Sequence, residues 1–332
     1  MPHHTTFLRS LIHLVLMAAT GLLQAQAQTP AQSSAQIYPA QPIKIIIPFA
    51  PGGSSDIVGR VFGQYLADFT KQAVVADNKA GGNGIIGTQF VKAAAADGYT
   101  LELTTNTTHA ANVSLYKKLP YDAMTDFEHI GMFGLSASVA VVAKDSKIKS
   151  IADLVAYAKA NPGKVFYGYY NSASQMTAAL FSVRTGAPMT GVPYKAISNA
   201  TTDLLGGQLQ VLFMEYLPAL PQIKGGNVMP LGVTAAKRYK AWPQVPAIGE
   251  SYPGYEIGFH LGLAAPAGTP TPIINKLHGW LTQALADPVF KQRLDDLGMD
   301  PVSMSREDYR AYSAKEITRW AEFVKASGVE VQ

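Results

Sequence analysis

The loop at residues 48–56 (PFAPGGSSD) carries the strongest chemical signal in the sequence, and that signal is anion binding. It separates an apolar, β-branched run from a helical pattern, so it ends at a predicted helix N-terminus. Backbone N–H groups in the first turn of a helix have no intrahelical acceptor, and the helix dipole makes that end positive. Such a turn can hold an anion without a cationic side chain, and glycines let the backbone approach a ligand closely. The candidate ligand-binding residues of this loop are Phe49, Ala50, Gly52, Gly53, Ser54, Ser55 and Asp56.

A second loop of the same kind lies at residues 165–175 (VFYGYYNSASQ), where hydroxyls and amides follow a predicted strand and open a predicted helix. Its tyrosines offer flat apolar walls that suit a planar ligand. In both loops the alternative is that Ser or Asp only caps the following helix. The carboxyl end of a strand in an α/β sheet is where such proteins bind ligands, which favours a site at the first loop. The candidates in the second loop are Tyr170, Asn171, Ser172, Ala173, Ser174 and Gln175.

The glycine-rich segment at residues 82–87 (GNGIIG) matches the spacing of a dinucleotide-binding fingerprint. Residues 77–81 separate it from the preceding strand, and no suitable acidic residue follows a buried strand about 20 residues later, so the pattern does not predict NAD binding. We interpret it as a second anion-accepting turn with Asn83 as a polar contact, or as a plain glycine-rich loop.

Further polar residues come directly after predicted strands. Thr105 and Asn106 follow the strand at 100–104, Glu215 follows residues 211–214, and His260 follows residues 257–259. Side chains at strand ends can face a ligand cleft. For Glu215 and His260 the alternative is a surface or capping role.

Motifs for catalysis or metal binding are missing from the sequence. There is no G-x-S-x-G, no H-E-x-x-H and no cysteine, and the histidines at 109, 129, 260 and 278 lack metal-ligand spacing. A hydrolase that assembles Ser, His and Asp from distant positions remains an alternative. We expect a protein that is not an enzyme and that needs no cofactor and no metal.

The composition predicts a folded protein of one large or two medium domains. The chain has 332 residues, of which 48% are hydrophobic and 15% charged. Its 27 Lys and Arg against 23 Asp and Glu give a formal charge of +4, spread along the whole chain. A charge so small and so dispersed does not indicate a nucleic-acid partner.

The first residues resemble an export signal. Arg9 precedes an apolar segment at 11–23, and Ala25-Gln26-Ala27 is a small-x-small cleavage site. A transmembrane anchor is the alternative, but it needs about 20 apolar residues, and about 13 are present. We therefore expect a signal peptide at 1–27, a flexible lead-in at 28–41, and a mature protein that is soluble in the periplasm.

Strand and helix patterns alternate along the rest of the chain, which is typical of an α/β fold. The small-residue stretch at 131–138 and the segment at 252–263 predict two crossovers between hinged lobes. The predicted lobe 1 combines 42–135 with 262–332, and lobe 2 is 136–261. Strands are expected at 43–47, 74–75, 100–104, 139–143, 165–170, 190–192 and 211–214. Helices are expected after 54–56 and 82–87 and at 151–160, 175–184, 199–205, 273–285, 288–297 and 306–326.

Six segments in order resemble the Bug receptors, the extracytoplasmic substrate-binding proteins of tripartite tricarboxylate transporters. The resemblance extends over essentially the whole mature chain. The segments are IIPFAPGGSSD (46–56), NKAGGNGIIGT (78–88), DGYTL (97–101), VPYK (192–195), LLGGQ (204–208) and APAGTP (265–270).

This resemblance implies a two-lobed periplasmic-binding-protein fold of the Venus-flytrap kind, type II-like, with a ligand cleft between the lobes. It implies a small carboxylate as ligand and a membrane permease of a tripartite tricarboxylate transporter as partner. In the family one carboxylate is held by backbone amides and ordered water at the loop that corresponds to 49–56. The second-lobe contacts correspond to 170–175 and to the turn at Tyr194 and Lys195.

Departures from the family pattern fall in the regions expected to face the ligand. YNSASQ at 170–175 replaces a glycine-rich run followed by His, Ala196 replaces a common Gly, and Phe259-His260 stands where Trp is frequent. The added aromatic and amide character favours a ring-bearing dicarboxylate such as terephthalate over an aliphatic diacid. We expect a monomer, and the alternative function is a periplasmic sensor that feeds a signalling partner.

Overall fold

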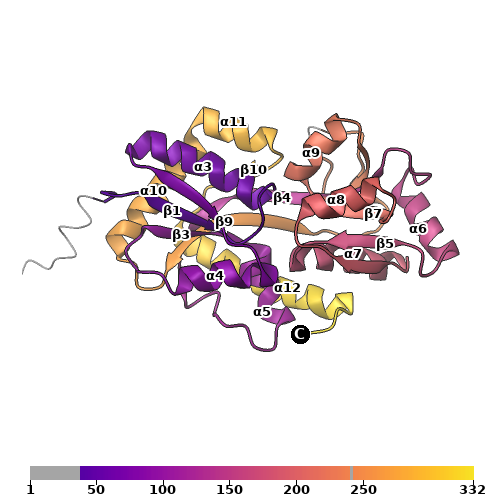
Figure 1. The fold of residues 1–332 in the computed structure, drawn as a ribbon, viewed down its shortest axis with the longest axis horizontal. Helices are drawn as coiled ribbons and strands as arrows, with labels where there is room; N and C mark the ends of the chain where they lie inside the picture. The colour runs from indigo at the N-terminus through magenta and orange to yellow at the C-terminus, as the bar shows by residue number, and fades with distance from the viewer. Residues whose placement is uncertain (1–37, 240–241) are drawn as a thin grey trace, which may run out of the picture. The chain divides into compact units, whose positions relative to one another are not determined.

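A ten-stranded mixed sheet is the framework of residues 41–332 (Figure 1). The computed structural model describes residues 38–239 and 242–332. The predicted signal peptide at 1–27 and most of the predicted lead-in at 28–41 lie outside the described residues. Along the sheet the strands run in the order β2-β1-β3-β9-β4-β7-β5-β6, with β8 and β10 paired to β4.

One lobe is built on three parallel strands: β1 (Ile43–Ile47) lies between β2 (Val74–Asn78) and β3 (Thr100–Thr105). All residues of β1 except Lys44 are buried, which confirms the predicted strand with two covered faces. Helix α3 (Ser54–Thr70) follows β1, and α4 (Ile85–Lys92) follows β2. Both helices begin at the loops that the sequence singles out.

The other lobe contains β5 (Phe166–Tyr169), β6 (Thr190–Pro193), β7 (Val211–Glu215) and β8 (Val228–Val233). Strands β5, β6 and β7 are parallel, whereas β7 and β8 both pair antiparallel with β4. The predicted helices are present as α6 (Ile151–Ala160), α7 (Ser172–Thr185) and α8 (Ile197–Leu205). Helix α9 (Tyr216–Lys224) and strand β8 have no counterpart among the predicted elements.

Two long antiparallel strands, β4 (Phe127–Ala143) and β9 (Gly258–Pro266), connect the lobes. The prediction of a strand limited to 139–143 was too short, because the small residues at 131–138 belong to β4. Glycine is required there by close packing: a Cβ at Gly134 would lie 2.4 Å from the carbonyl oxygen of Asp300 on β10 (Asp300–Pro301). The register of β4 against β9 shifts beside Gly131 and Gly134. The predicted lobe boundaries at 135/136 and 261/262 fall inside these two strands.

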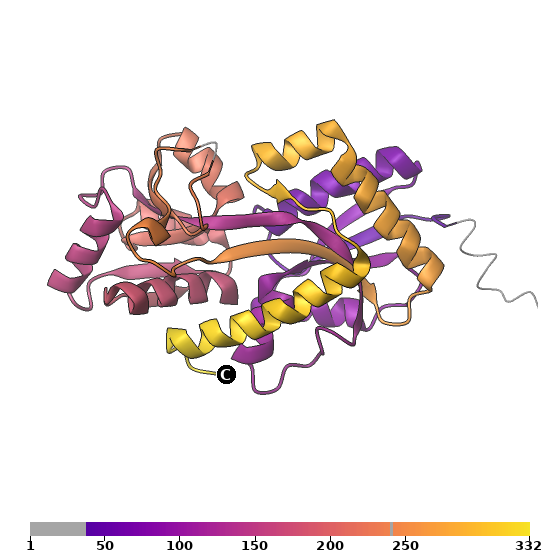
Figure 2. The same ribbon diagram turned by 180° about the vertical axis from the view of Figure 1, so that it is seen from behind.

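Three C-terminal helices complete the fold, as predicted: α10 (Thr271–Ala286), α11 (Pro288–Asp296) and α12 (Arg306–Ser327). Figure 2 shows that α12 runs from one lobe toward the helices of the other. Its Trp320 and Val324 are buried in the same core cluster as Phe181 of α7. None of the helices in the described ranges combines the length and the apolar character needed to cross a bilayer.

Candidate functional site

A cavity of about 410 Å³ lies between the two lobes, where several loops follow the ends of the strands. Both lobes contribute to its wall. From the first lobe come Phe49, Ala50, Gly53, Ser55, Ala80, Gly81, Gly82, Asn83, Gly84, Thr105, Asn106 and Thr107. From the second lobe and β9 come Tyr170, Asn171, Ala173, Tyr194, Lys195, Ala196, Ile197, Glu215, Phe259, His260 and Leu261.

Most of the candidate residues named from the sequence line this cavity, although they come from seven separate parts of the chain. The candidates in its wall are Phe49, Ala50, Gly53, Ser55, Asn83, Thr105, Asn106, Tyr170, Asn171, Ala173, Tyr194, Glu215 and His260. The candidates outside its wall are Gly52, Ser54, Asp56, Ser172, Ser174 and Gln175.

At the start of α3, some backbone N–H groups are hydrogen-bonded within the protein and others are not. The Gly52 N–H donates to Asp56 Oδ2 at 3.0 Å, and the Ser54 N–H donates to Glu215 Oε2 at 3.3 Å. The N–H groups of Gly53 and Ser55 have no acceptor among the described residues. The protein itself therefore occupies the donors of Gly52 and Ser54, and the donors of Gly53 and Ser55 are the ones that a ligand could use.

Asp56 stabilises the loop instead of facing the cavity. Its Oδ1 accepts hydrogen bonds from Arg60 Nε at 2.9 Å and from Asn78 Nδ2 at 3.0 Å, and Asn78 also donates to the Phe49 carbonyl. Burial alone would raise the pKa of Asp56, but the bonds from Arg60, Gly52 and Asn78 hold it below its ordinary value. An ionised Asp56 thus fixes the loop conformation in which Gly53 and Ser55 face the cavity.

Glu215, the last residue of β7, reaches from the second lobe to the N-terminus of α3. Its Oε2 accepts from the Ser54 N–H, and its Oε1 accepts from Asn171 Nδ2 at 3.4 Å. Burial raises the pKa of the Glu215 carboxyl, and the hydrogen bonds from Ser54 and Asn171 oppose that rise. Among the described residues of the cavity wall, Glu215 is the one acidic residue and Lys195 is the one lysine or arginine.

The second predicted loop is organised by a helix cap. Asn171 Oδ1 accepts from the Ser174 N–H at 2.7 Å, and Ser174 Oγ accepts from the Asn171 N–H at 3.2 Å, which is a capping box at the start of α7. Ser172 Oγ donates to Asn112 Oδ1 at 2.8 Å. Ser172 and Ser174 therefore stabilise the start of the helix, because both residues lie outside the cavity wall and their hydroxyls bind protein groups.

Asn106, which directly follows β3, and His260 on β9 form the floor of the cavity. Asn106 Oδ1 accepts from the His260 N–H at 2.6 Å, and its Nδ2 donates to Glu316 Oε2 at 3.0 Å. The amide of Asn106 is thus bonded within the protein. The ring nitrogens of His260 have no partner among the described residues, and Nδ1 is fully buried. Burial, with a smaller contribution from His129, lowers the pKa of His260 to about 3, so its imidazole is neutral near pH 7.

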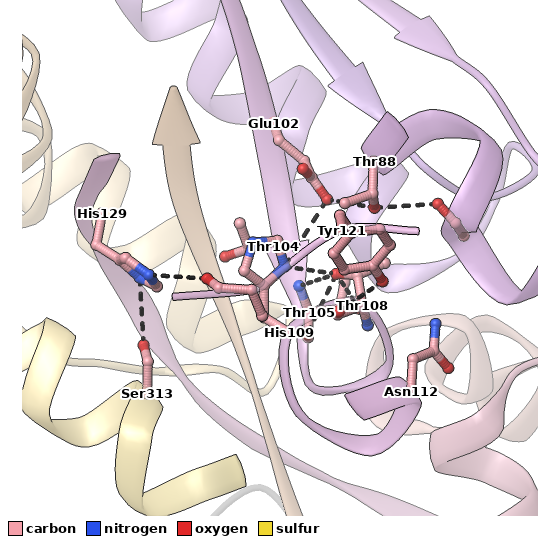
Figure 3. A network of polar contacts seen from close by, with 12 residues as sticks. Thr88, Glu102, Thr104, Thr105, Thr108, His109, Asn112, Tyr121, His129 and Ser313 are labelled. Atoms are coloured by element: carbon pink, nitrogen blue, oxygen red, sulfur yellow. Dashed lines mark hydrogen bonds and ion pairs between the residues drawn. The ribbon is translucent and has the colours of Figure 1, made fainter. Parts of the chain in front are cut away.

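A buried polar network behind this floor holds the π-helical turn η2 (Thr107–Ala111) in place (Figure 3). Glu102 Oε1 lies 2.8 Å from Thr88 Oγ1, and Thr108 Oγ1 lies 3.0 Å from His109 Nδ1. Burial raises the pKa of Glu102 to about 8 and lowers that of His109 well below its ordinary value. Both side chains are therefore mainly uncharged at neutral pH. No group of three acidic, His or Cys side chains in the described ranges is suited to a metal ion.

Several residues of the cavity wall were not among the candidates from the sequence. Gly84 has φ +85°, and a Cβ there would lie 2.6 Å from Thr108 Cγ2, so the glycine-rich turn is required by backbone conformation and packing. Lys195 belongs to the turn that the family resemblance already places among the second-lobe contacts, and Phe259 to a segment that the resemblance already places in the ligand-facing region. The other wall residues outside the candidate set are Ala80, Gly81, Gly82, Thr107, Ala196, Ile197 and Leu261.

Comparison with known proteins identifies the family. The family model described as "Tripartite tricarboxylate transporter family receptor" matches residues 58–329. Protein BugT of Bordetella pertussis is 36% identical over 96% of this chain and 98% of its own. The structure of R. palustris Rpa4515 with adipate is 31% identical, with a TM-score of 0.86 over 88% of this chain and 99% of that one.

Two further solved structures agree with that assignment. The periplasmic binding protein BugD is 33% identical, with a TM-score of 0.84 over 89% of this chain and all of its own. MatC from Rhodopseudomonas palustris with bound malate is 28% identical, with a TM-score of 0.81 over 86% of this chain and all of its own. The two-lobed α/β architecture and the matched segments thus have one explanation: the chain belongs to the tripartite tricarboxylate transporter receptor family, the Bug family of periplasmic solute-binding proteins.

Proposed function

We propose that this protein captures a small organic carboxylate in the cavity between its lobes and delivers it, unaltered, to the membrane permease of a tripartite tricarboxylate transporter. One observation carries the proposal: the unused N–H groups of Gly53 and Ser55, at the positive end of α3, belong to the cavity wall. Relatives solved with adipate and with malate support a carboxylate as the ligand class.

The expected ligand is a dicarboxylate, and a ring-bearing one such as terephthalate before an aliphatic one. One carboxylate would accept from Gly53 and Ser55, and Lys195 is the cation available to the other. Phe49, Tyr170, Tyr194 and Phe259 add aromatic surface to the wall, and the volume of about 410 Å³ lies in the range of small-molecule sites. This aromatic wall supports the preference for a flat ring.

Capture would proceed by closure of the two lobes, here proposed as 42–135 with 262–332 and 136–261, about a hinge in β4 and β9. Contacts across the cleft stabilise the closed arrangement: Ser54 with Glu215, and the Ala173 N–H with Thr107 Oγ1 at 3.2 Å. A ligand shifts the lobes toward closure only if it binds the closed form more tightly than the open form. Contacts from both lobes to one small molecule would provide that difference.

The setting of this function is proposed from the sequence. Residues 1–27 would direct export and be removed, leaving a soluble, monomeric periplasmic receptor without nucleic-acid partners. The family to which the chain belongs supports the periplasmic location.

Differential scanning fluorimetry of the mature chain tests the proposal. We expect terephthalate, or an aliphatic diacid such as adipate, to raise the melting temperature, and glucose to leave it unchanged. If no carboxylate in a broad panel raised the melting temperature while a neutral sugar did, the proposal would be wrong.

A further inference from the structure

The carboxylate of Glu215 is an unusual component of a cavity that is proposed to bind an anion. Each of its oxygens has one hydrogen bond, and both bonds are long, at 3.3 Å from the Ser54 N–H and 3.4 Å from Asn171 Nδ2. An ionised carboxylate has about four acceptor positions. The buried Ser54 hydroxyl, which has no other partner among the described residues, also lowers the pKa of this carboxylate and takes up one of those positions. At least one position therefore remains for a group in the cavity.

No protein cation supplies a bond there. Among the described residues, Glu215 has no ion pair within 4.0 Å, and Lys195, in the same cavity wall, has none either. The hydroxyl of Tyr170 lies beside the backbone of Glu215, 3.5 Å from its nitrogen, and not on a carboxylate oxygen. A partly buried anion without a strong partner is unfavourable, which the raised pKa of Glu215 also reflects.

The position of Glu215 relative to the proposed ligand site determines what it can recognise. Glu215 is bonded to the N–H of Ser54, and the unused N–H groups belong to Gly53 and Ser55, the neighbours of Ser54 in the chain. A ligand carboxylate at those donors would thus lie beside the Glu215 carboxylate at one helix terminus. Two anions so placed repel each other unless a donor lies between them.

We propose that Glu215 is a specificity-determining residue that accepts a hydrogen bond from a hydroxyl or ammonium group on the carbon next to the ligand carboxylate held by α3. This inference rests on the proposed function and refines its ligand class: α-hydroxy and α-amino carboxylates, whether aliphatic or ring-bearing, should bind more tightly than unsubstituted acids such as terephthalate and adipate. The ligand's donor fills a free acceptor position of Glu215 and separates the two carboxylates. An acid without that donor has only the repulsion between its own carboxylate and the carboxylate of Glu215.

Isothermal titration calorimetry with matched ligands tests the inference. The aliphatic set is succinate, malate and aspartate, and the ring-bearing set is phenylacetate, mandelate and phenylglycine. Hydrogen bonds to charged groups are strong enough that we expect the substituted acids to bind the mature wild-type chain at least about tenfold more tightly than the unsubstituted acid of their set.

The variant Glu215→Gln removes the charge and replaces one acceptor oxygen by a donor. We expect its preference for the substituted acids to fall to within about threefold, with unsubstituted acids binding as tightly as, or more tightly than, they bind wild type. Glu250→Gln is the matched control, because Glu250 is exposed, pairs with Arg238 and lies outside the cavity wall. It should keep the wild-type preference.

Equal or tighter binding of succinate and phenylacetate to wild type would overturn the inference, as would an unchanged preference in Glu215→Gln. If Glu215→Gln does not fold, Glu215→Asp replaces it, and it should weaken the preference by shortening the reach of the acceptor. Failure of all six acids to bind would overturn the inference as well. The proposed function would fail only if the broader carboxylate panel also gave no rise in melting temperature.

Discussion

Placing a carboxylate at residue 53 should separate ligand binding from stability. Gly53 is the N-cap of α3, has no side-chain cap, and has φ −82° and ψ 171°, which any residue can adopt. A Cβ at Gly53 would meet no atom within 4 Å. In Gly53→Asp the new carboxylate can accept from the free N–H groups of the first helical turn, where a bound ligand is proposed to accept. The variant therefore places a permanent competitor in the anion site.

The two effects of Gly53→Asp have opposite signs. An Asp N-cap is a few tenths of a kcal/mol better than a Gly N-cap, so the free energy of unfolding should rise slightly. Two unit charges about 5 Å apart, at an effective dielectric constant of about 20, repel by about 3 kcal/mol. Together with the loss of the N–H donors, this should weaken carboxylate binding by about 100-fold or more.

Calorimetric titration and urea unfolding of the same samples measure both effects. Gly53→Asn caps the helix without a charge and should weaken binding by a smaller factor, because it removes donors but adds no repulsion. Gly279→Asp adds the same charge on α10, at a residue outside the cavity wall where a Cβ would meet no atom within 4 Å, and should bind as wild type does. Wild-type affinity in Gly53→Asp would refute the assignment of the anion site to this turn.

Two further predictions concern the support of the cavity floor. Burial raises the pKa of Glu102 to about 8 from an ordinary value of 4.5, so ionisation of this carboxyl opposes folding. Relative to Glu102→Gln, the free energy of unfolding of the wild type should fall as the pH rises from about 4.5 to 8. Below that range the two proteins should be equally stable, as measured by urea unfolding at each pH. Gly84→Ala should lower the unfolding free energy by about 1–3 kcal/mol in the same assay, because the φ of +85° at Gly84 and the contact with Thr108 disfavour a side chain. A stability difference between wild type and Glu102→Gln that does not change with pH would contradict the first prediction. Wild-type stability of Gly84→Ala would contradict the second.

Elements whose ends are fixed by neighbouring residues could be predicted from the sequence. Helix α6 has its predicted bounds because Ser150 accepts from the Asp153 N–H at its start and Asn161-Pro162-Gly163 ends it. Strand β4 was predicted too short because Gly131 and Gly134 resemble a flexible stretch. Glycine is needed at these two positions because β10 and α10, which follow more than 130 residues later in the chain, pack closely against them.

The residues of the cavity likewise divide into those fixed by neighbouring residues and those fixed by distant segments. The pattern at 48–56 identified a helix N-terminus with free donors, because capping and helix geometry depend on neighbouring residues. The occupation of the Ser54 N–H by Glu215 joins residues 161 positions apart and has no local signal. Likewise, Ser172 was a candidate from its place in a loop, but Asn112 on another element accepts its hydroxyl proton. Contacts between distant segments thus determine which local donors remain available to a ligand.

A crystal structure of the mature chain with the carboxylate that most raises its melting temperature would show whether the N-terminus of α3 holds the ligand. We expect a carboxylate oxygen of the ligand within about 3 Å of the backbone nitrogen of Gly53 or Ser55. A ligand bound elsewhere, or N–H groups of Gly53 and Ser55 that bind only protein acceptors in the complex, would contradict it.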